Sequence, residues 1–526
     1  MRQSFFHKAL IFLQSQWQIC TLCILAFCIR LPWLDLGLPQ QYHPDEWVYL
    51  TSAFKLFKLE FFNGTQSTNF FYYLVFIGYL FLLPYEFLLG RIRSPRELYE
   101  YFYQFGDPFI DYANSHFMIV ARLVAVIFTI ICGCIGGVWL SKRVPKNIAL
   151  ITVGLFFLLP LEFLYSRFAL PDLPLTCAMF LTLICIQKFH HEPSIKNWIV
   201  ACSLSMVCLG LKLPGAVVFF PLILSLWFNK QKFTKQMLFK YAGIFIITIT
   251  VGTVIVAPQF VFSNYLTGFI ENTAAIQYSG KPAVELYHHD KLNTQWDYLR
   301  FIFEDYGIAI SVLMITGIAL HFKARWRSAL LWTSALLFYF VVFQSASIKM
   351  ARYAIPLTTI MLFSILPYGL LYVFKHPLCK SIYAKVFVCI ILFAYPLYKT
   401  FGYFSVISKD DTRTMAYKWL EKQDLRTKSF AREIHYTPIL PKTYRKPVIE
   451  HWYIGVNTIS DLKQQGIDIV MISDQMQNGF LSGSHVTRNY KSYYDSLQLL
   501  AHFEQNPQPI PSNPTIDIFQ VIPRAK

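Results

Sequence analysis

The chain has 526 residues, of which 55% are hydrophobic, 17% aromatic and only 15% charged. Soluble domains average about 25% charged residues, so this composition excludes an ordinary soluble globular protein and indicates lipid as the main solvent. The net charge of +17 does not indicate a nucleic-acid partner, because residues 403–526 supply only +3 of it and the rest lies mostly in short loops between apolar segments, the positive-inside pattern of membrane proteins.

Long apolar runs recur from the N-terminus to about residue 402, and a membrane-spanning helix needs roughly 20 such residues. We therefore expect a polytopic α-helical membrane domain over 1–402 and an extramembrane domain over 403–526. The first run is followed by Arg30-Leu-Pro-Trp, which lacks a small-residue cleavage site, so it is interpreted as a span. All eleven cysteines lie in or beside apolar segments, which indicates packing residues instead of metal or redox pairs.

The basic loops predict the topology of the membrane domain. With a cytoplasmic N-terminus, every inner loop is basic, as in Lys142-Arg143, and two long outer loops cover 31–113, with interfacial helices, and 258–305. About eleven spans are then expected, near 10–30, 114–140, 147–165, 173–188, 197–211, 214–229, 239–257, 306–322, 327–345, 353–374 and 384–402.

The segment "NFFYYLVFIGYLFLLPYEFLLG" (69–90) is long enough to cross the membrane. A single crossing there would turn every later basic loop to the outer side. We therefore interpret it as lying in or dipping into the outer interface, with its tyrosines and Glu86 near the headgroups. A hairpin with part of 97–113 is the alternative.

Residues 403–526 alternate between helix and strand patterns. "TRTMAYKWLEKQ" and "YYDSLQLLAHF" have helical spacing, whereas "GIDIVMIS" and "TIDIFQVI" are typical of strands. These patterns predict a small α/β domain outside the membrane, on the outer side.

Four polar motifs fall at the outer ends of predicted spans, where charges are costly and usually mark a site. They are His43, Asp45 and Glu46 in "YHPDE", Arg167 and Asp172 in "YSRFALPDLP", Lys212 in "LGLKLPG", and Lys349, Arg352 and Tyr353 in "SIKMARYAIP". Such a set suits a reaction in which a carboxylate accepts a hydroxyl proton and Lys or Arg holds a phosphate leaving group. Aromatic side chains such as Tyr42 can stack on a sugar.

Each motif also has a purely structural interpretation. Pro44 followed by Asp45 and Glu46 is a favourable helix start. Asp172 can cap a helix with Arg167 as its partner, and Lys212 can extend toward the headgroups. The cations of the fourth motif oppose the positive-inside bias and are the hardest to explain in this way. "YHHD" (288–290 with Tyr287) offers metal-ligand residue types without a typical spacing, so a divalent cation is left open.

In this order, the four motifs resemble the bacterial relatives of protein O-mannosyltransferases and of the lipid A aminoarabinose transferase, which are GT-C glycosyltransferases. The resemblance covers the membrane domain, and the C-terminal domain resembles the outer cap of many members. It implies a GT-C fold, a polyprenyl-phosphate-linked sugar donor, inversion at the anomeric carbon and an active site on the outer face of the cytoplasmic membrane. Where the aminoarabinose transferase carries Glu-Lys-Pro-Pro at the end of the first loop, this chain has "STNFFYY", which argues against a metal site of the kind that run helps to build.

The resemblance also assigns roles to residues. Asp45 matches the catalytic acid of the first outer loop, with Glu46 beside it, and Asp172 matches the acid of the second. Arg352 and Tyr353, with Lys349 and Lys212, are expected near the donor phosphate. Our hypothesis makes Asp45 the general base, Asp172 and Glu46 orienting groups for the acceptor or a cation, and His43, Tyr42 and Arg167 the sugar and acceptor contacts.

Two other classes of function remain as alternatives. A transporter or flippase of lipid-linked sugars favours polar groups near the midplane and paired repeats, whereas here the charges lie at span ends and no repeat is visible. An envelope glycan polymerase or ligase would share the same chemistry. The acceptor is expected to be a hydroxyl of a lipid, glycan or protein, and membrane lipids are the other partners.

Overall fold

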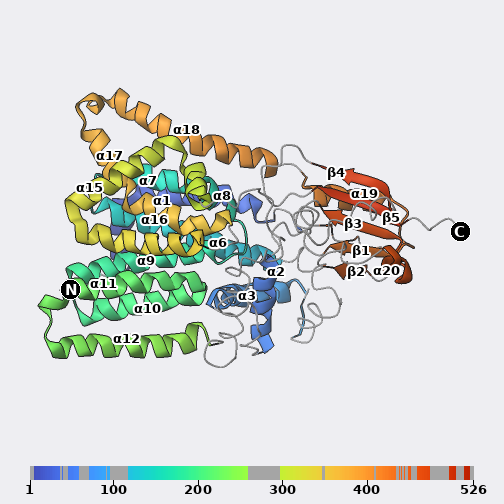
Figure 1. Ribbon diagram of the computed structural model, residues 1–526, viewed down its shortest axis with the longest axis horizontal. Coiled ribbons are helices and arrows are strands. Elements are labelled where there is room, and N and C mark those ends of the chain that lie inside the picture. Colours follow the sequence, from blue (N-terminus) through green and yellow to red (C-terminus); the bar gives the residue numbers. More distant parts are fainter. Residues whose placement is uncertain are drawn as a thin grey trace.

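The computed structural model describes residues 5–35, 38, 45–58, 70–90, 92–94, 116–258, 296–345, 350–407, 410–433, 437–438, 440, 444, 448–451, 459–473, 497–504 and 515–521. The first part of the chain is helical and the last part carries a sheet (Figure 1). The longer helices are α1 (Phe5–Arg30), α3 (Phe70–Leu88), α6 (His116–Ser141), α7 (Lys146–Leu158), α9 (Asp172–His191), α10 (Ile195–Leu211), α11 (Phe219–Asn229), α12 (Lys235–Val256), α15 (Asp297–Gln344), α16 (Ile355–Ser364), α17 (Leu366–Lys375) and α18 (Ile382–Ile407).

Short helices connect or precede these elements. They are η1 (Leu31–Trp33), α2 (Glu46–Lys55), η2 (Leu56–Lys58), α8 (Pro160–Tyr165), η3 (Leu213–Val218), η4 (Lys230–Lys232), η5 (Ala351–Ala354) and η6 (Pro377–Cys379). Among the described residues, 8 helical segments are long and apolar enough to cross a membrane. The predicted fold class, a polytopic α-helical membrane protein with a small C-terminal α/β domain, is confirmed, and every predicted span overlaps a helix.

Helix α15 covers two of the predicted spans. Its 48 residues are interrupted at Arg325, whose backbone is not helical (φ −153°, ψ 65°). This break falls in the basic turn Lys323-Ala-Arg325 that the sequence placed between two spans. The two apolar halves are therefore joined by a tight helical corner.

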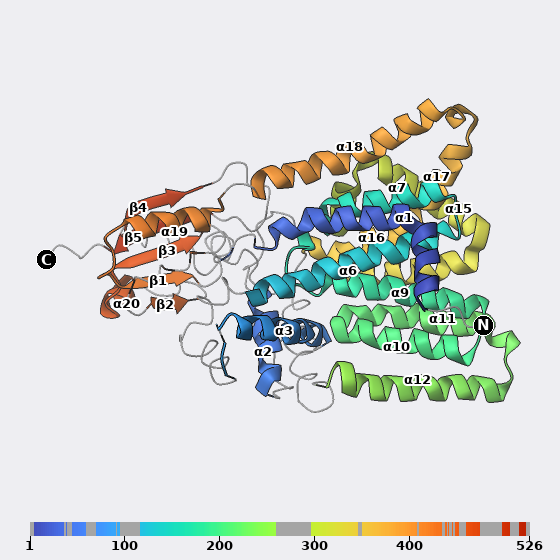
Figure 2. The same ribbon diagram turned by 180° about the vertical axis from the view of Figure 1, so that it is seen from behind.

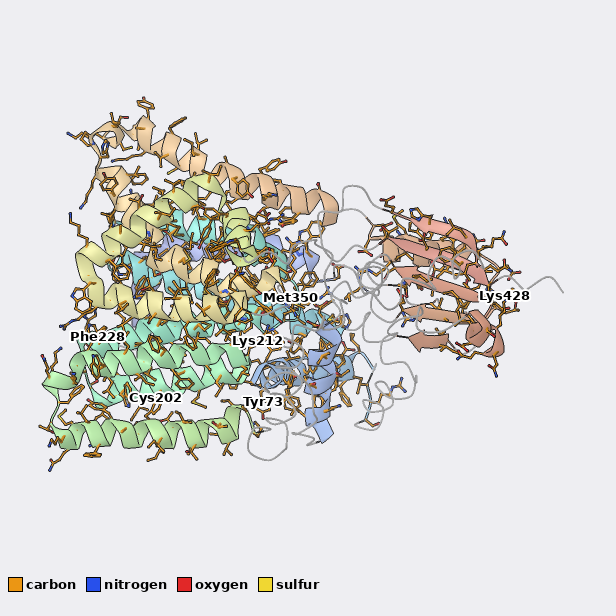
Figure 3. The ribbon with its side chains drawn as sticks, viewed as in Figure 1. Tyr73, Cys202, Lys212, Phe228, Met350 and Lys428 are labelled. Carbon is orange, nitrogen blue, oxygen red and sulfur yellow. The ribbon has the colours of Figure 1, made fainter. Side chains whose placement is uncertain are left out.

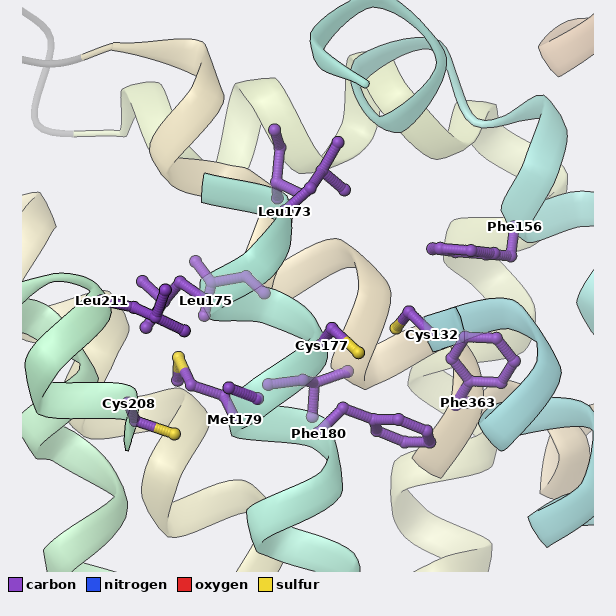
Figure 4. Close-up of a cluster of buried hydrophobic side chains, with 14 of the residues drawn as sticks. Cys132, Phe156, Leu173, Leu175, Cys177, Met179, Phe180, Cys208, Leu211 and Phe363 are labelled. Atoms are coloured by element: carbon purple, nitrogen blue, oxygen red, sulfur yellow. The ribbon is translucent and has the colours of Figure 1, made fainter. Parts of the chain in front are cut away.

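The fraction of each helix that is buried distinguishes the central helices of the bundle from those at its edge. Helix α9 buries 78% of its most apolar window, whereas α12 and α18 each bury only 11%. Figures 1 and 2 agree, because α12 and α18 lie at opposite edges of the bundle. Figure 4 shows the packing around α9, where Cys177 faces Cys132 and Phe180 lies beside Phe363. These cysteines are free and buried, as expected of small packing residues.

Helix α3 occupies the segment whose position was uncertain from the sequence. Figure 1 places α2 and α3 together at the end of the bundle nearer the C-terminal sheet. By length and composition α3 also qualifies as a span, so its interfacial position stays a prediction. Glu86, expected near the headgroups, is buried and its Oε1 lies 2.7 Å from Nδ1 of His116.

The C-terminal sheet has the strand order β2-β1-β3-β5-β4. Its strands are β1 (Phe430–Glu433), β2 (Val448–His451), β3 (Ile469–Ser473), β4 (Leu497–Phe503) and β5 (Ile516–Val521), with helices α19 (Thr412–Lys422) and α20 (Ile459–Gln464). Strands β2, β1 and β3 are parallel, and β5 and β4 continue the sheet in antiparallel pairing.

One prediction in this domain was wrong. The helical spacing of "YYDSLQLLAHF" is overridden, because 497–503 forms the edge strand β4. Antiparallel pairing with β5, with a bulge between Leu499 and Ala501, satisfies the backbone there. The bulge shifts the alternation of side chains, which explains why the apolar spacing resembled a helix. The predicted α19, β3 and β5 are confirmed.

The bundle has two distinct ends. Figure 3 shows Lys212 and Met350 at the end nearer the sheet domain and Phe228 at the opposite end. The basic turn with Lys230 and Lys232 directly follows Phe228. The polar motifs of α10 and η5 thus lie at one end of the bundle and this basic turn lies at the other.

Candidate active site

Two ion pairs meet around Tyr353 at the end of the bundle nearer the sheet domain. Arg352 donates from Nη2 to Oδ2 of Asp45 at 2.6 Å. Lys212 donates from Nζ to Oδ1 of Asp172 at 2.7 Å. The Lys212 ammonium lies 4.2 Å from the centre of the Tyr353 ring and the Arg352 guanidinium 5.3 Å from it. One ring therefore contacts both cations, so five predicted site residues, Tyr353 among them, form one cluster, called here the paired-charge site.

Local sequence explains how these side chains are held. Lys212 ends α10 in an extended conformation (φ −164°, ψ 138°), and Pro214 stops the helix from continuing. Asp172 is the first residue of α9, where the helix dipole favours a carboxylate. Arg352 lies in η5, directly before α16. Each charge is thus fixed at an interruption between helices.

The two carboxylates of the site differ in exposure. The side chain of Asp172 is 3% exposed and that of Asp45 is 31% exposed. Asp45 precedes α2 but its side chain does not cap that helix. Asp45 is therefore the carboxylate that a substrate can reach, and Asp172 belongs to the wall of the site.

Glu46 has a different environment from its neighbour Asp45. Both its oxygens bond the guanidinium of Arg122 (2.8 Å to Nε and 2.7 Å to Nη2), and Oε1 also accepts the backbone N–H of Ala169 at 2.8 Å. Neither charged side chain is exposed. Glu46 thereby ties α2 to α6 and to the loop before Asp172, which makes it a positioning group.

Arg122 was missed in the sequence analysis. It is a single charge within the apolar run of α6 (His116–Ser141), and an isolated charge in such a run signals a buried partner or a site. The isolated charge could have been noticed in the sequence. Its partner Glu46 could not have been predicted, because 76 residues separate the two.

Aromatic residues of α15 that the sequence did not single out pack behind Tyr353. The Phe343 ring lies 4.9 Å from that of Tyr353 and 4.5 Å from that of Tyr339. The hydroxyl of Tyr298 accepts the backbone N–H of Met350 at 3.3 Å. This packing fixes the backbone that leads into Arg352.

Tyr49 of α2 borders the same site. Its side chain is buried, and burial, together with the negative charge of Asp45, raises the pKa of its phenol well above the ordinary value. Tyr49 is therefore neutral at physiological pH and can act only as a hydrogen-bonding or packing group there.

Arg167 lies in a separate pocket of aromatic rings. Its guanidinium is 4.1 Å from the ring centre of Phe163, 5.3 Å from that of Phe404 and 5.8 Å from that of Trp33. The residue is 1% exposed, and within the described part of the chain its three side-chain nitrogens have no hydrogen-bond partner. Burial lowers its pKa to about 9, with a smaller contribution from nearby Arg30. The contacts of Arg167 are thus aromatic, and its predicted role toward sugar or acceptor remains a prediction.

Some predicted residues lie outside the described part of the chain. They are Tyr42, His43, Lys349 and the "YHHD" stretch. Within the described ranges, no group of three His, Cys, Asp or Glu side chains could hold a metal ion. The described site therefore offers two carboxylates, two cations and an aromatic face.

Comparison with known proteins gives one family match and similar solved structures. Residues 113–257 match the family model described as dolichyl-phosphate-mannose-protein mannosyltransferase. The apo structure of ArnT from Cupriavidus metallidurans is 10% identical, with a TM-score of 0.54 over 95% of this chain and 97% of that one. Its structure bound to undecaprenyl phosphate is 11% identical, with a TM-score of 0.53 over 96% and 98%. A search of the curated proteins gives no match. The likeness in fold extends over nearly the whole of both chains, and together with the match over 113–257 it agrees with the resemblance that the four motifs suggested.

Proposed function

We propose that this chain, which has an ArnT-like GT-C fold and is related to the protein mannosyltransferases, is an inverting glycosyltransferase. It moves a sugar from a polyprenyl-phosphate donor to a hydroxyl of a lipid, glycan or protein. The donor class is supported by the ArnT relative, which was solved with undecaprenyl phosphate bound. The observation that carries the proposal is the paired-charge site, where Asp45 and Arg352 meet Lys212 and Asp172.

In the proposed reaction, Asp45 accepts the proton of the acceptor hydroxyl. The acceptor oxygen forms a bond to the anomeric carbon on the face opposite the phosphate, so the configuration inverts. The bond from that carbon to the phosphate oxygen breaks, and the electron pair leaves with the phosphate. Arg352 and Lys212 stabilise the charge that develops there, and Lys349 is a further predicted phosphate ligand.

The other residues position these groups. Glu46 and Arg122 fix α2, and hence Asp45, against α6. Asp172 orients Lys212 through the 2.7 Å contact. Arg167, Tyr42 and His43 are assigned to the acceptor or sugar, as the sequence motifs suggest. The proposed place of the reaction is the outer face of the cytoplasmic membrane, where the sheet domain would also lie.

The test is sugar transfer by purified protein from a panel of radiolabelled polyprenyl-phosphate sugars, with Asp45→Asn beside the unchanged chain. General base catalysis typically contributes 10²–10⁴-fold, so about that loss of turnover is expected. Glu304→Gln is the matched control, because it removes an exposed carboxylate that also pairs with an arginine (2.6 Å to Arg300). Full activity of folded Asp45→Asn protein would contradict the base assignment.

The same assay separates the alternatives. Donor binding and translocation without sugar release would indicate a flippase. Long products grown on one acceptor would indicate a glycan polymerase, whereas a single added sugar supports the proposed transferase.

A further inference from the structure

Both cations of the paired-charge site are already neutralised by carboxylates. Arg352 and Lys212 carry two positive charges, and Asp45 and Asp172 carry two negative charges at 2.6 and 2.7 Å from them. A donor phosphate entering this site would add negative charge beyond what Arg352 and Lys212 already balance, among side chains that are mostly buried, which is costly. The phosphate therefore competes with a carboxylate for one of these two cations.

Solvent exposure and position relative to a helix indicate which carboxylate gives up its cation. Asp172 is 3% exposed and opens α9, where the helix dipole holds its charge in place. Asp45 is 31% exposed and does not cap its own helix. Its partner Arg352 has the planar guanidinium that phosphate oxygens prefer, because two parallel hydrogen bonds can form. The pair between Asp45 and Arg352 is the one a phosphate can replace.

We propose that the donor phosphate takes Arg352 from Asp45, so that the base is released only when the donor is bound. This inference rests on the proposed function and adds how donor binding regulates the base. A carboxylate held by an arginine is a weaker base than one that has lost this partner. After transfer, Asp45 carries the acceptor proton and is neutral, so it cannot reclaim Arg352 until it is deprotonated. Release of the polyprenyl phosphate product is therefore coupled to loss of that proton.

The test is the affinity of the purified full chain for undecaprenyl phosphate, which has no sugar and reports binding alone. If Asp45 competes with phosphate, Asp45→Asn binds this lipid more tightly than the unchanged chain, by roughly the 5- to 150-fold typical of coupled sites. Glu304→Gln, the control outside the site, leaves the affinity unchanged. Equal or weaker binding by Asp45→Asn would overturn the proposal.

A double-mutant cycle distinguishes direct exchange from a general charge effect. In an Arg352→Gln background the gain from Asp45→Asn should vanish, because the shared cation is absent. If Asp45→Asn still raises the lipid affinity in this background, the increase reflects only the removed negative charge. That result would overturn the proposed exchange of Arg352. The double variant loses both charges together, so it leaves no unpaired buried ion.

The outcomes also separate this inference from the proposed function. If no variant binds undecaprenyl phosphate and none transfers sugar, the donor class itself is wrong and the exchange falls with it. If transfer from a polyprenyl-phosphate donor is observed but Asp45→Asn binds no more tightly, the proposed function stands and only the exchange is refuted.

Discussion

Glu46 and Arg122 form an ion pair, with bonds of 2.7 and 2.8 Å, that is completely hidden from solvent. It lies next to Asp45, the proposed base, and reaches the backbone of Ala169 three residues before Asp172. The start of α2 and the loop before Asp172, which are far apart in sequence, are therefore held by the same ion pair. The relationship explains how α2, a helix of only 10 residues, can hold the carboxylate of Asp45 in place.

Replacement of Glu46 by Ala should destabilise the protein strongly. Removing one partner of a buried ion pair leaves an uncompensated charge and costs about 3–5 kcal/mol. A lowered thermal unfolding temperature in detergent, with loss of transfer, is the expected result. Glu304→Ala, which breaks the exposed pair with Arg300, should cost less than about 1 kcal/mol. Equal unfolding temperatures for both variants would show that the buried pair is no anchor.

Lys212 and Tyr353 should contribute to donor binding in different ways. Lys212→Met removes a charged hydrogen-bond donor worth about 1.5–3 kcal/mol, so the KM for donor should rise by one to two orders of magnitude. Tyr353→Phe keeps the ring that lies 4.2 Å from the Lys212 ammonium and should be nearly neutral, whereas Tyr353→Leu should lose about 0.5–2 kcal/mol. Steady-state kinetics with varied donor measure both. A Phe variant as impaired as the Leu variant would assign the role to the hydroxyl.

Arg167→Met should stabilise the fold while lowering transfer. The guanidinium is buried, and its nitrogens have no hydrogen-bond partner among the residues that the structure describes. A buried charge of this kind is costly to keep. Such local conflicts are expected at functional sites. Thermal unfolding and transfer assays on the same preparation test both parts. A less stable variant would mean that the aromatic contacts of Phe163, Phe404 and Trp33 offset the cost of burial.

His502 should make the edge of the C-terminal sheet sensitive to pH. Its Nδ1 lies 2.6 Å from Oδ1 of Asp517 on the neighbouring strand, and this hydrogen bond raises the pKa of the imidazole above its ordinary value. A raised pKa in the folded state stabilises the protonated form. The contribution is fully present below a pH of about 6.5 and is lost as the pH rises through the higher folded-state pKa.

Hydrogen exchange of β4 and β5 in the full chain, corrected for intrinsic rates, measures this effect. Protection should fall as the pH rises above about 6.5 in the unchanged chain. The loss should be less than about 1 kcal/mol, because the His502 side chain is 47% exposed. His502→Gln should show no such change. Equal pH dependence in both proteins would rule out His502 as the cause.

The fold of the membrane part could be predicted from the sequence because hydrophobic length is a local property. Runs of about 20 apolar residues are typical of spanning helices, and all predicted spans overlap helices. The edge strand β4 could not be predicted in this way. Its pairing with β5 across a bulge overrides the helical spacing, and pairing between strands is not a local property.

The sequence by itself also determined that charges gather at span ends, since a charge beside an apolar run is costly whatever the tertiary structure. Only the tertiary structure decided how those charges combine. Asp45 and Arg352 are separated by 307 positions, and nothing in either motif identifies the other as its partner. The contrast between partly exposed Asp45 and buried Glu46, adjacent in the chain, is likewise decided by Arg122 on another helix, because burial depends on what packs around a side chain.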